Sequence, residues 1–202
     1  MHLHAVLDVS DAEGAAAAAA ASEPGCGHHL LVHDFSDGAA IERPQNVVIL
    51  SFPSTFDPSL APPGTLSVHA YTAGNEPHGP WAGLERGSGA YAAFKEERSA
   101  VLWSSLERVV PGARTRARAA AVGTPLTHAR FLRRAGGSYG PGISAATGSF
   151  PGPATPLPGL YRCGDSCAPG IGVPAAAASG MIAANTLVPV WDHLELLGAI
   201  GL

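Results

Sequence analysis

The chain has 202 residues, with 16 acidic and 12 basic side chains and a net charge of −4, so no basic nucleic-acid-binding surface is expected. Hydrophobic residues make up 46% of the chain, enough for one domain with a core, while 25 Gly and 18 Pro predict many turns. No apolar run reaches the length of a membrane span, and the alanine tract at 15–21 is too short for one.

Three cysteines cannot form an even disulfide framework, which favours a reducing compartment. The first residues have neither the basic region of a signal peptide nor the Arg/Ser-rich composition of a plastid transit peptide. We therefore expect that Met1 is not the natural start of the protein.

Four strand candidates precede the first clear helix. Residues 2–9 and 65–72 alternate between apolar and polar side chains, residues 46–52 are rich in β-branched residues, and 28–34 is a further candidate. The intervening residues 10–27 are expected to form a surface loop. Because no helix is expected between these strands, the pattern predicts an antiparallel sheet.

The second half of the chain predicts two helices separated by irregular structure. Apolar residues keep helical spacing over 91–110, and Pro111-Gly112 ends that helix. A strand is expected at 114–122 and a helical turn within 125–134, followed by Gly/Pro-rich loop. The remaining elements are a strand stub at 160–163, a helix at 173–188 and an apolar tail at 191–202 that packs down onto the protein.

The most informative stretch runs from 159 to 180. A short apolar segment leads to Asp165, and a Gly/Pro loop then opens an alanine-rich helix. Glycines let a flat ligand approach the backbone, and the first amides of a helix are unpaired donors with partial positive charge. Pro174 suits the first helical turn, and Asp165 can accept hydrogen bonds from ligand hydroxyls.

This stretch resembles the C-terminal flavin motif of the carotenoid isomerase and phytoene desaturase-like FAD oxidoreductases. In that family a Gly-Asp-Ser segment precedes a Pro-Gly-x-Gly-x-Pro turn. The resemblance implies FAD as the cofactor, with Asp165 at its ribityl or phosphate part and the amides around Gly172 at the flavin ring. It implies no catalytic side chain, and the cofactor-binding residues that it implies are Gly164, Asp165, Ser166, Pro169, Gly170, Gly172, Val173 and Pro174.

Further segments extend the resemblance over nearly the whole chain. They include His2-Leu3-His4, His69-Ala70-Tyr71-Thr72 and Gly137-Ser138-Tyr139-Gly140-Pro141, which implies that Tyr139 lies near the flavin or anchors a loop. The Gly-x-Gly-x-x-Gly unit with which the family begins is missing here. The sequence therefore looks like a fragment, a truncated gene model or a degenerate copy.

The resemblance implies an α/β fold, namely an α+β fragment of a flavin amine-oxidase-like FAD/NAD(P)-binding fold. Residues 1–122 would be mainly the substrate domain, and residues 123–202 would return to the FAD-binding domain. The implied activity is FAD-dependent carotenoid cis–trans isomerisation of poly-cis-lycopene in a plastid, with peripheral membrane contact consistent with a lipid-dissolved polyene. The alternatives are a phytoene desaturase or retinol saturase-like oxidoreductase, and a non-catalytic remnant that binds no FAD.

Two short motifs in the loop have other readings. The segment 170–175 formally matches a dinucleotide fingerprint, but no following strand ends in an acidic residue, so we reject it as a complete Rossmann unit. A Gly/Pro turn that simply begins a buried helix is the structural alternative. Gly164-Asp165-Ser166 also opens the signature of some serine hydrolases. The catalytic Asp and His partners of such a serine would have to be Asp192 and His193, which are adjacent and not spaced like a catalytic pair.

No metal site is expected from the cysteine and histidine spacing. Cys26-Gly27-His28-His29 and Cys163-x3-Cys167 lack the matched pairs of closed zinc sites, and a strand would point His28 and His29 to opposite faces. His69 faces a substrate cavity or sits within the sheet, and the sequence does not decide between the two. The basic segment 127–134 binds phosphate or forms a solvated patch.

Overall fold

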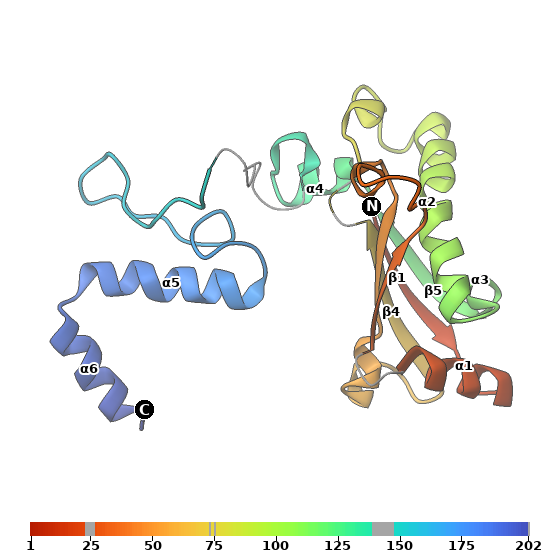
Figure 1. Cartoon of the computed structure of the whole chain (residues 1–202), viewed down its shortest axis with the longest axis horizontal. Helices are drawn as coiled ribbons and strands as arrows, with labels where there is room; N and C mark the ends of the chain where they lie inside the picture. The colour runs from red at the N-terminus through yellow and green to blue at the C-terminus, as the bar shows by residue number, and fades with distance from the viewer. Residues whose placement is uncertain (23–26, 73, 75, 139–147, 202) are drawn as a thin grey trace. The chain divides into compact units, whose positions relative to one another are not determined.

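The computed structural model describes residues 1–22, 27–72, 74, 76–138 and 148–201 (Figure 1). The chain divides into two compact units, Met1–Ser138 and Tyr139–Leu202. This division falls later than the 122/123 boundary expected from the sequence, because helix α4 (Pro125–Phe131) packs with the elements that precede and follow it in the first unit. The assignment of the two parts to a substrate domain and an FAD domain remains a prediction.

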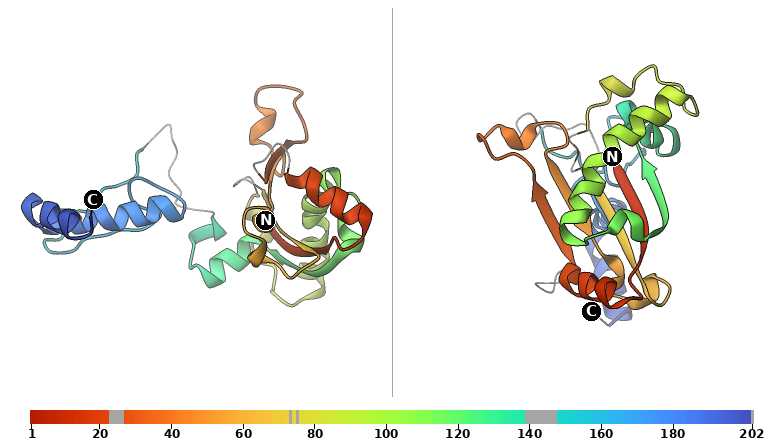
Figure 2. Two further views of the ribbon diagram at one scale, coloured as in Figure 1. Left: turned by 90° about the horizontal axis from the view of Figure 1, so that it is seen from below. Right: turned by 90° about the vertical axis from the view of Figure 1, so that its right-hand side faces the viewer.

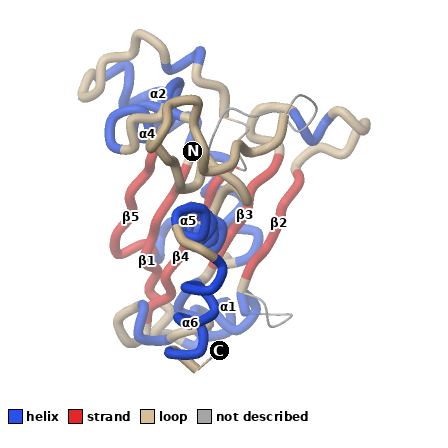
Figure 3. Tube along the Cα trace, turned by 90° about the vertical axis from the view of Figure 1, so that its left-hand side faces the viewer, coloured by secondary structure: helices blue, strands red, loops and turns tan. Residues whose placement is uncertain are grey.

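The first unit is built on a five-stranded antiparallel sheet with the strand order β2-β3-β4-β1-β5 (Figure 3). This confirms the predicted mixed α/β class and the antiparallel sheet. The four N-terminal strands lie within the ranges expected from the sequence. The strands are β1 (His2–Asp8), β2 (His28–Val32), β3 (Val47–Ser51), β4 (Thr65–Thr72) and β5 (Ala117–Gly123).

One face of the sheet forms the hydrophobic core. Leu3 and Leu7 of β1 pair with Ala70 and Leu66 of β4, and all four are buried. Helix α2 (Gly89–Val109) crosses this face and contributes buried residues that include Leu102, Trp103 and Leu106 (Figure 2). The opposite face of the same two strands carries their polar and histidine side chains.

Helix α2 begins two residues before the range 91–110 expected from the sequence, because Ser88 caps it. The side chain of Ser88 accepts a 3.1 Å hydrogen bond from the amide of Tyr91, which satisfies one of the unpaired amides of the first turn. Trp81, fully buried, packs on Tyr91 and Phe94 from outside the helix. These contacts fix the first turns of α2 against the core.

Residues 10–27 were expected to form a surface loop, and this expectation is wrong. Helix α1 (Ala12–Ser22) occupies most of the segment. Alanine has the highest helix propensity of any residue type, so the alanine run favours a helix. The carboxylate of Asp11 stabilises its start by accepting a 2.6 Å hydrogen bond from the amide of Gly14. Buried Ala17 and Ala21 attach the helix to the core.

The connection after α2 differs in detail from the expected strand at 114–122. Its first residues form a short helix, α3 (Ala113–Arg116), and β5 starts only at Ala117. Glu107, in the last turn of α2, accepts hydrogen bonds from the amides of Gly112 and Arg114 and so holds this turn in helical form. The helical turn predicted within 125–134 is confirmed as α4, which Thr124 caps.

Among the described residues, five short 3-10 helices occupy the connecting segments. One of them, Pro53–Thr55, follows β3, and another, Pro58–Leu60, lies close behind it. Hydrogen bonds between Ser54 and Ser67, each 3.0 Å long, tie this connection to β4. The other three are Ala40–Glu42, Gly79–Trp81 and Ala135–Gly137.

Where the structure describes it, the second unit contains loops and two helices. Helix α5 (Val173–Leu187) confirms the predicted C-terminal helix. The strand stub expected at 160–163 is not a strand, because only Tyr161 forms a β-bridge, with Ala154. The apolar tail expected at 191–202 forms helix α6 (Val190–Ala199), no residue of which is buried; Trp191 is 74% exposed. None of the helices described is both long and apolar enough to traverse a bilayer.

Candidate functional site

The glycine loop, residues 162–172 before α5, is held by backbone hydrogen bonds to residues 151–153. The amide of Ala168 donates to the carbonyl of Pro151 at 2.9 Å, and the amide of Arg162 donates to Pro153 at 2.9 Å. Inside the loop, the amide of Cys167 donates to the carbonyl of Gly164 at 3.0 Å. The loop therefore has a defined backbone course rather than the variable course of a simple linker.

Three glycines of this loop adopt backbone angles that side chains rarely permit. Gly164, Gly170 and Gly172 have φ values of +114°, +133° and +102°. A Cβ on Gly164 would meet no atom within 4 Å, and one on Gly172 only the Pro174 ring at 4.0 Å, whereas one on Gly170 would lie 3.1 Å from the Phe150 ring. Gly170 thus serves packing, while Gly164 and Gly172 leave open space beside the backbone.

The N-terminus of α5 fits a ligand with hydrogen-bond acceptors. Gly172 is its N-cap residue and supplies no side chain to the first amides, and Pro174 occupies the first turn as predicted. Asp165 is half-buried, and its carboxylate accepts a hydrogen bond from the Ser166 hydroxyl at 3.4 Å. Open glycine backbone, helix amides and a carboxylate that can accept from hydroxyls form a donor and acceptor set that suits FAD.

The other predicted residues of the loop have mixed exposure. Pro169, Val173 and Pro174 are exposed, while Ser166 is half-buried. Cys167 is buried and Cys163 is exposed, and both are free thiols. Cys26 and Tyr139, which the sequence singled out, lie outside the described residues.

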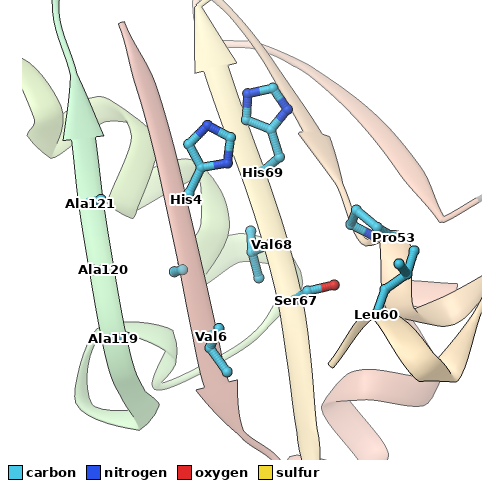
Figure 4. A pocket seen from close by; sticks show the side chains of 11 residues that line it. His4, Val6, Pro53, Leu60, Ser67, Val68, His69, Ala119, Ala120 and Ala121 are labelled. Atoms are coloured by element: carbon cyan, nitrogen blue, oxygen red, sulfur yellow. The ribbon is translucent and has the colours of Figure 1, made fainter. Parts of the chain in front are cut away.

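A second candidate site lies on the sheet face opposite the core. An open trough with a volume of about 530 Å³ runs across β5, β1 and β4 (Figure 4). Its floor is apolar and small, with Val6, Ala119 and Ala121 on the strands, and Pro53 and Leu60 border it. We call this feature the sheet trough.

Histidines gather at one end of the sheet trough. His4 and His69 are direct partners in the β1–β4 register, and their rings stack with centroids 4.3 Å apart (Figure 4). His2 lies two residues before His4 on the same face, and its Nδ1 lies 2.9 Å from Nε2 of His69 in a hydrogen bond. The rings of Tyr71 and His128 pack against His2, at 5.5 and 4.8 Å between centroids.

Burial keeps the inner histidines of this cluster neutral. Desolvation lowers the pKa of His2 to about 3 and that of His69 to about 4, from an ordinary value of 6.5. The pKa of His128 is lowered as well, and burial is the largest cause. At neutral pH these rings therefore offer unprotonated nitrogens.

The sequence did not reveal this cluster. It left His69 undecided and gave His2 and His4 only as part of a resembling segment. Alternation places His2 and His4 on the same face of β1, and His69 on one face of β4. Only the register of β1 against β4 brings the three side chains together. The other histidine pair behaves as the strand period predicts: His28 is exposed, and His29 turns to the carbonyl of Ala21 at 2.8 Å.

The chain is similar to known carotenoid isomerases. It is 38% identical over 162 residues to the chloroplastic prolycopene isomerase of Arabidopsis thaliana and 36% identical over 186 residues to prolycopene isomerase 2 of an Oncidium hybrid cultivar. These alignments cover 78% and 85% of the chain. A hydroxyneurosporene desaturase of Rubrivivax gelatinosus is 44% identical over 75 residues, which is 36% of the chain and 14% of that enzyme.

These similarities confirm the resemblance that the sequence motifs indicated. No family model matches the chain. The alignments cover 26% of the Arabidopsis protein and 31% of the Oncidium protein, so the chain spans about a quarter to a third of the length of these relatives.

Proposed function

We propose that this chain is part of an FAD-dependent carotenoid cis–trans isomerase that acts on poly-cis-lycopene. The observation that carries the proposal is the 36–38% identity with prolycopene isomerases over about four fifths of the chain. The open glycine backbone at the N-terminus of α5 supports it, because that geometry suits a flat cofactor. The names of the relatives place them in chloroplasts, and we propose a plastid location for this chain as well.

The residues proposed to hold FAD are those of the glycine loop. Asp165 would accept hydrogen bonds from ribityl hydroxyls, and Gly164 and Gly172 would admit the cofactor to the backbone, with Ser166, Pro169, Gly170 and Pro174 shaping the loop. The amides of the first turn of α5, beginning at Val173, would stabilise negative charge at the ring. When bound, the flavin supplies the redox-active ring through which a polyene double bond is isomerised without net oxidation.

The sheet trough is the proposed contact surface for the polyene. Its volume of about 530 Å³ lies within the range of small-molecule sites, and its floor of alanine and valine offers an apolar wall, with His4 and His69 at one end. A long hydrocarbon requires such a surface, since every buried polar group without a partner costs binding free energy. Peripheral contact with a membrane would bring a lipid-dissolved substrate to this surface.

Desaturation is the second candidate activity. It is favoured by the 44% identity with a hydroxyneurosporene desaturase, even though the aligned segment is short. Both activities would use the same flavin loop, but they differ in product. An isomer keeps the mass of the substrate, whereas desaturation removes two hydrogens from it.

The proposal is tested first on the purified chain and then in a chimera. We expect the chain to take up FAD and show flavin absorbance, and Asp165→Asn to weaken this binding about tenfold, while Asp192→Asn on exposed α6 leaves it unchanged. In the chimera, the chain replaces the aligned segment of the Arabidopsis enzyme, and we expect conversion of poly-cis-lycopene to isomers of equal mass. A product lighter by two hydrogens would favour desaturation, and an inactive, colourless protein would favour the remnant.

A further inference from the structure

The histidine cluster at the end of the sheet trough has the composition of a transition-metal site. The cluster consists of His2, His4 and His69, and one ring nitrogen from each lies within 4.8 Å of the other two. We propose that these three histidines bind one divalent transition-metal ion, with Zn²⁺ as the expected occupant. The proposal rests on this geometry alone and is independent of the proposed isomerase function.

The strand register fixes two of the three ligands relative to each other. His4 and His69 are cross-strand partners, and His2 projects from the same face of β1 two residues earlier. In a tetrahedral zinc site with bonds of about 2.0–2.1 Å, neighbouring nitrogens lie roughly 3.4 Å apart. The 2.9 Å between His2 Nδ1 and His69 Nε2 is already close to that spacing.

The third ligand has the freedom to complete the site. His4 is exposed, so its ring can rotate from its stacked position toward the other two nitrogens without displacing core residues. One of the two rings donates the hydrogen shared between His2 and His69; as the ion takes its place, that ring's proton moves to its other nitrogen, where the second ring already carries its own proton. No net proton release from neutral rings is needed.

The ligand type selects the metal. Three imidazoles without a carboxylate suit Zn²⁺, Cu²⁺ or Ni²⁺ and disfavour Mg²⁺ and Ca²⁺, which prefer oxygen ligands. Three protein ligands also leave a fourth tetrahedral position for solvent or a small ligand. Because His4 and His69 also line the sheet trough, the ion would lie at its end.

The neighbouring rings give the site a supporting shell. Tyr71 stacks on His69 at 4.9 Å and on His2 at 5.5 Å between ring centroids, and His128 of α4 covers His2. His2 is only 8% exposed. Two of the ligands are thus already positioned, which reduces the ordering that binding requires.

The test measures metal binding by the full chain carrying a C-terminal, histidine-free affinity tag. Zn²⁺ is titrated in competition with a chromogenic chelator, and Co²⁺ serves as a spectroscopic probe through its visible absorption. We expect one equivalent of Zn²⁺ and an intense Co²⁺ spectrum of a four-coordinate site. His4→Ala, which changes an exposed residue and spares the core, and His69→Ala should each weaken Zn²⁺ binding about tenfold or more.

The matched control is His28→Ala, which removes an exposed histidine from β2 of the same sheet. It should bind Zn²⁺ as the unaltered chain does. Wild-type affinity in His4→Ala, an equal loss in His28→Ala, or a Co²⁺ spectrum typical of six-coordinate solvated ion in the unaltered chain would each overturn the proposal.

Discussion

The backbone amide of Gly164 donates a 3.1 Å hydrogen bond to the hydroxyl of Ser179, fifteen positions further along the chain. Ser179 belongs to α5 and is only 2% exposed. This bond joins the residue before Asp165 to the interior of the helix whose first amides face the glycine loop. The position of Asp165 relative to α5 is therefore set by a buried side chain as well as by the loop itself.

Removal of this hydroxyl should loosen the loop. We expect Ser179→Ala to leave the Gly164 amide without its partner and to speed its hydrogen exchange about tenfold, which corresponds to roughly 1.4 kcal/mol. Amide exchange measured by NMR checks this. Thr186→Val removes a hydroxyl that bonds within the same helix, to the carbonyl of Ile182, and should leave the Gly164 exchange rate unaltered.

Gly170 should tolerate no side chain. Its φ of +133° is unfavourable for alanine, and the new Cβ would lie 3.1 Å from the Phe150 ring, so Gly170→Ala should destabilise the second unit by about 1–3 kcal/mol. Gly180→Ala places a methyl group in open space in the interior of α5 and should stabilise it by up to about 1 kcal/mol. Urea unfolding of both variants measures the difference, and equal effects would contradict the argument.

A buried ion pair should dominate the polar stability of the first unit. The carboxylate of Glu76 is 3% exposed, binds Arg98 at 2.8 and 3.0 Å, and accepts a 2.8 Å hydrogen bond from the indole of Trp81. Glu76→Ala should cost about 3–5 kcal/mol, because it leaves the arginine and the indole without their shared partner. Denaturant unfolding checks this value.

A surface pair offers the contrast for that variant. Arg114 and Glu96 form an ion pair whose side chains are 50% and 65% exposed, so Glu96→Ala should change the free energy of unfolding little. A similar loss in the two variants would show that burial does not determine the contribution of Glu76.

Acid should destabilise the first unit through its histidine cluster. The unfolded chain binds protons at His2 and His69 as the pH falls below about 6.5, but the folded chain, with pKa values of about 3 and about 4, does not. The free energy of unfolding should therefore fall with decreasing pH by up to about 1.4 kcal/mol per pH unit for each histidine. The slope is expected between pH values of about 6.5 and 4.5, before the carboxylates titrate.

Denaturant unfolding in metal-free buffer over this range measures the slope. Other titratable groups of the cluster, namely His4, Tyr71 and His128, face the same rings, so His69→Asn tests the assignment. That variant should show a shallower slope than the unaltered chain. A flat profile in the unaltered chain would contradict the burial of these rings.

Local patterns predicted the elements that alternate or repeat cleanly. Strand β4 and helices α2 and α5 lie close to where alternation, helical spacing of apolar residues and glycine or proline signals placed them. Helix α1 was missed because loop residues on both sides outweighed the propensity of its alanines, and its attachment through Ala17 and Ala21 depends on tertiary packing. The prediction of a strand at 160–163 was wrong because a short apolar run does not specify a pairing partner.

The candidate sites divide in the same way. The glycine loop could be proposed as a cofactor site from sequence because its residues lie within about twenty consecutive positions. The histidine cluster joins residues 67 positions apart, His2 and His69, through a strand register that no local pattern encodes. The sheet trough likewise depends on β5 pairing with β1, which brings Ala121 opposite His4.

The exposure of Trp191 has a practical consequence for fluorescence work. The chain has three tryptophans, and Trp81 and Trp103 are buried in the first unit, whereas Trp191 on α6 is 74% exposed. A chain that retains only Trp191 would have its fluorescence maximum at the long wavelength of a solvent-exposed tryptophan. Its emission would report quenching, vesicle insertion or ligand-induced ordering of α6 without a signal from Trp81 and Trp103. The complementary double-tryptophan chain would follow the melting of the β-sheet core alone.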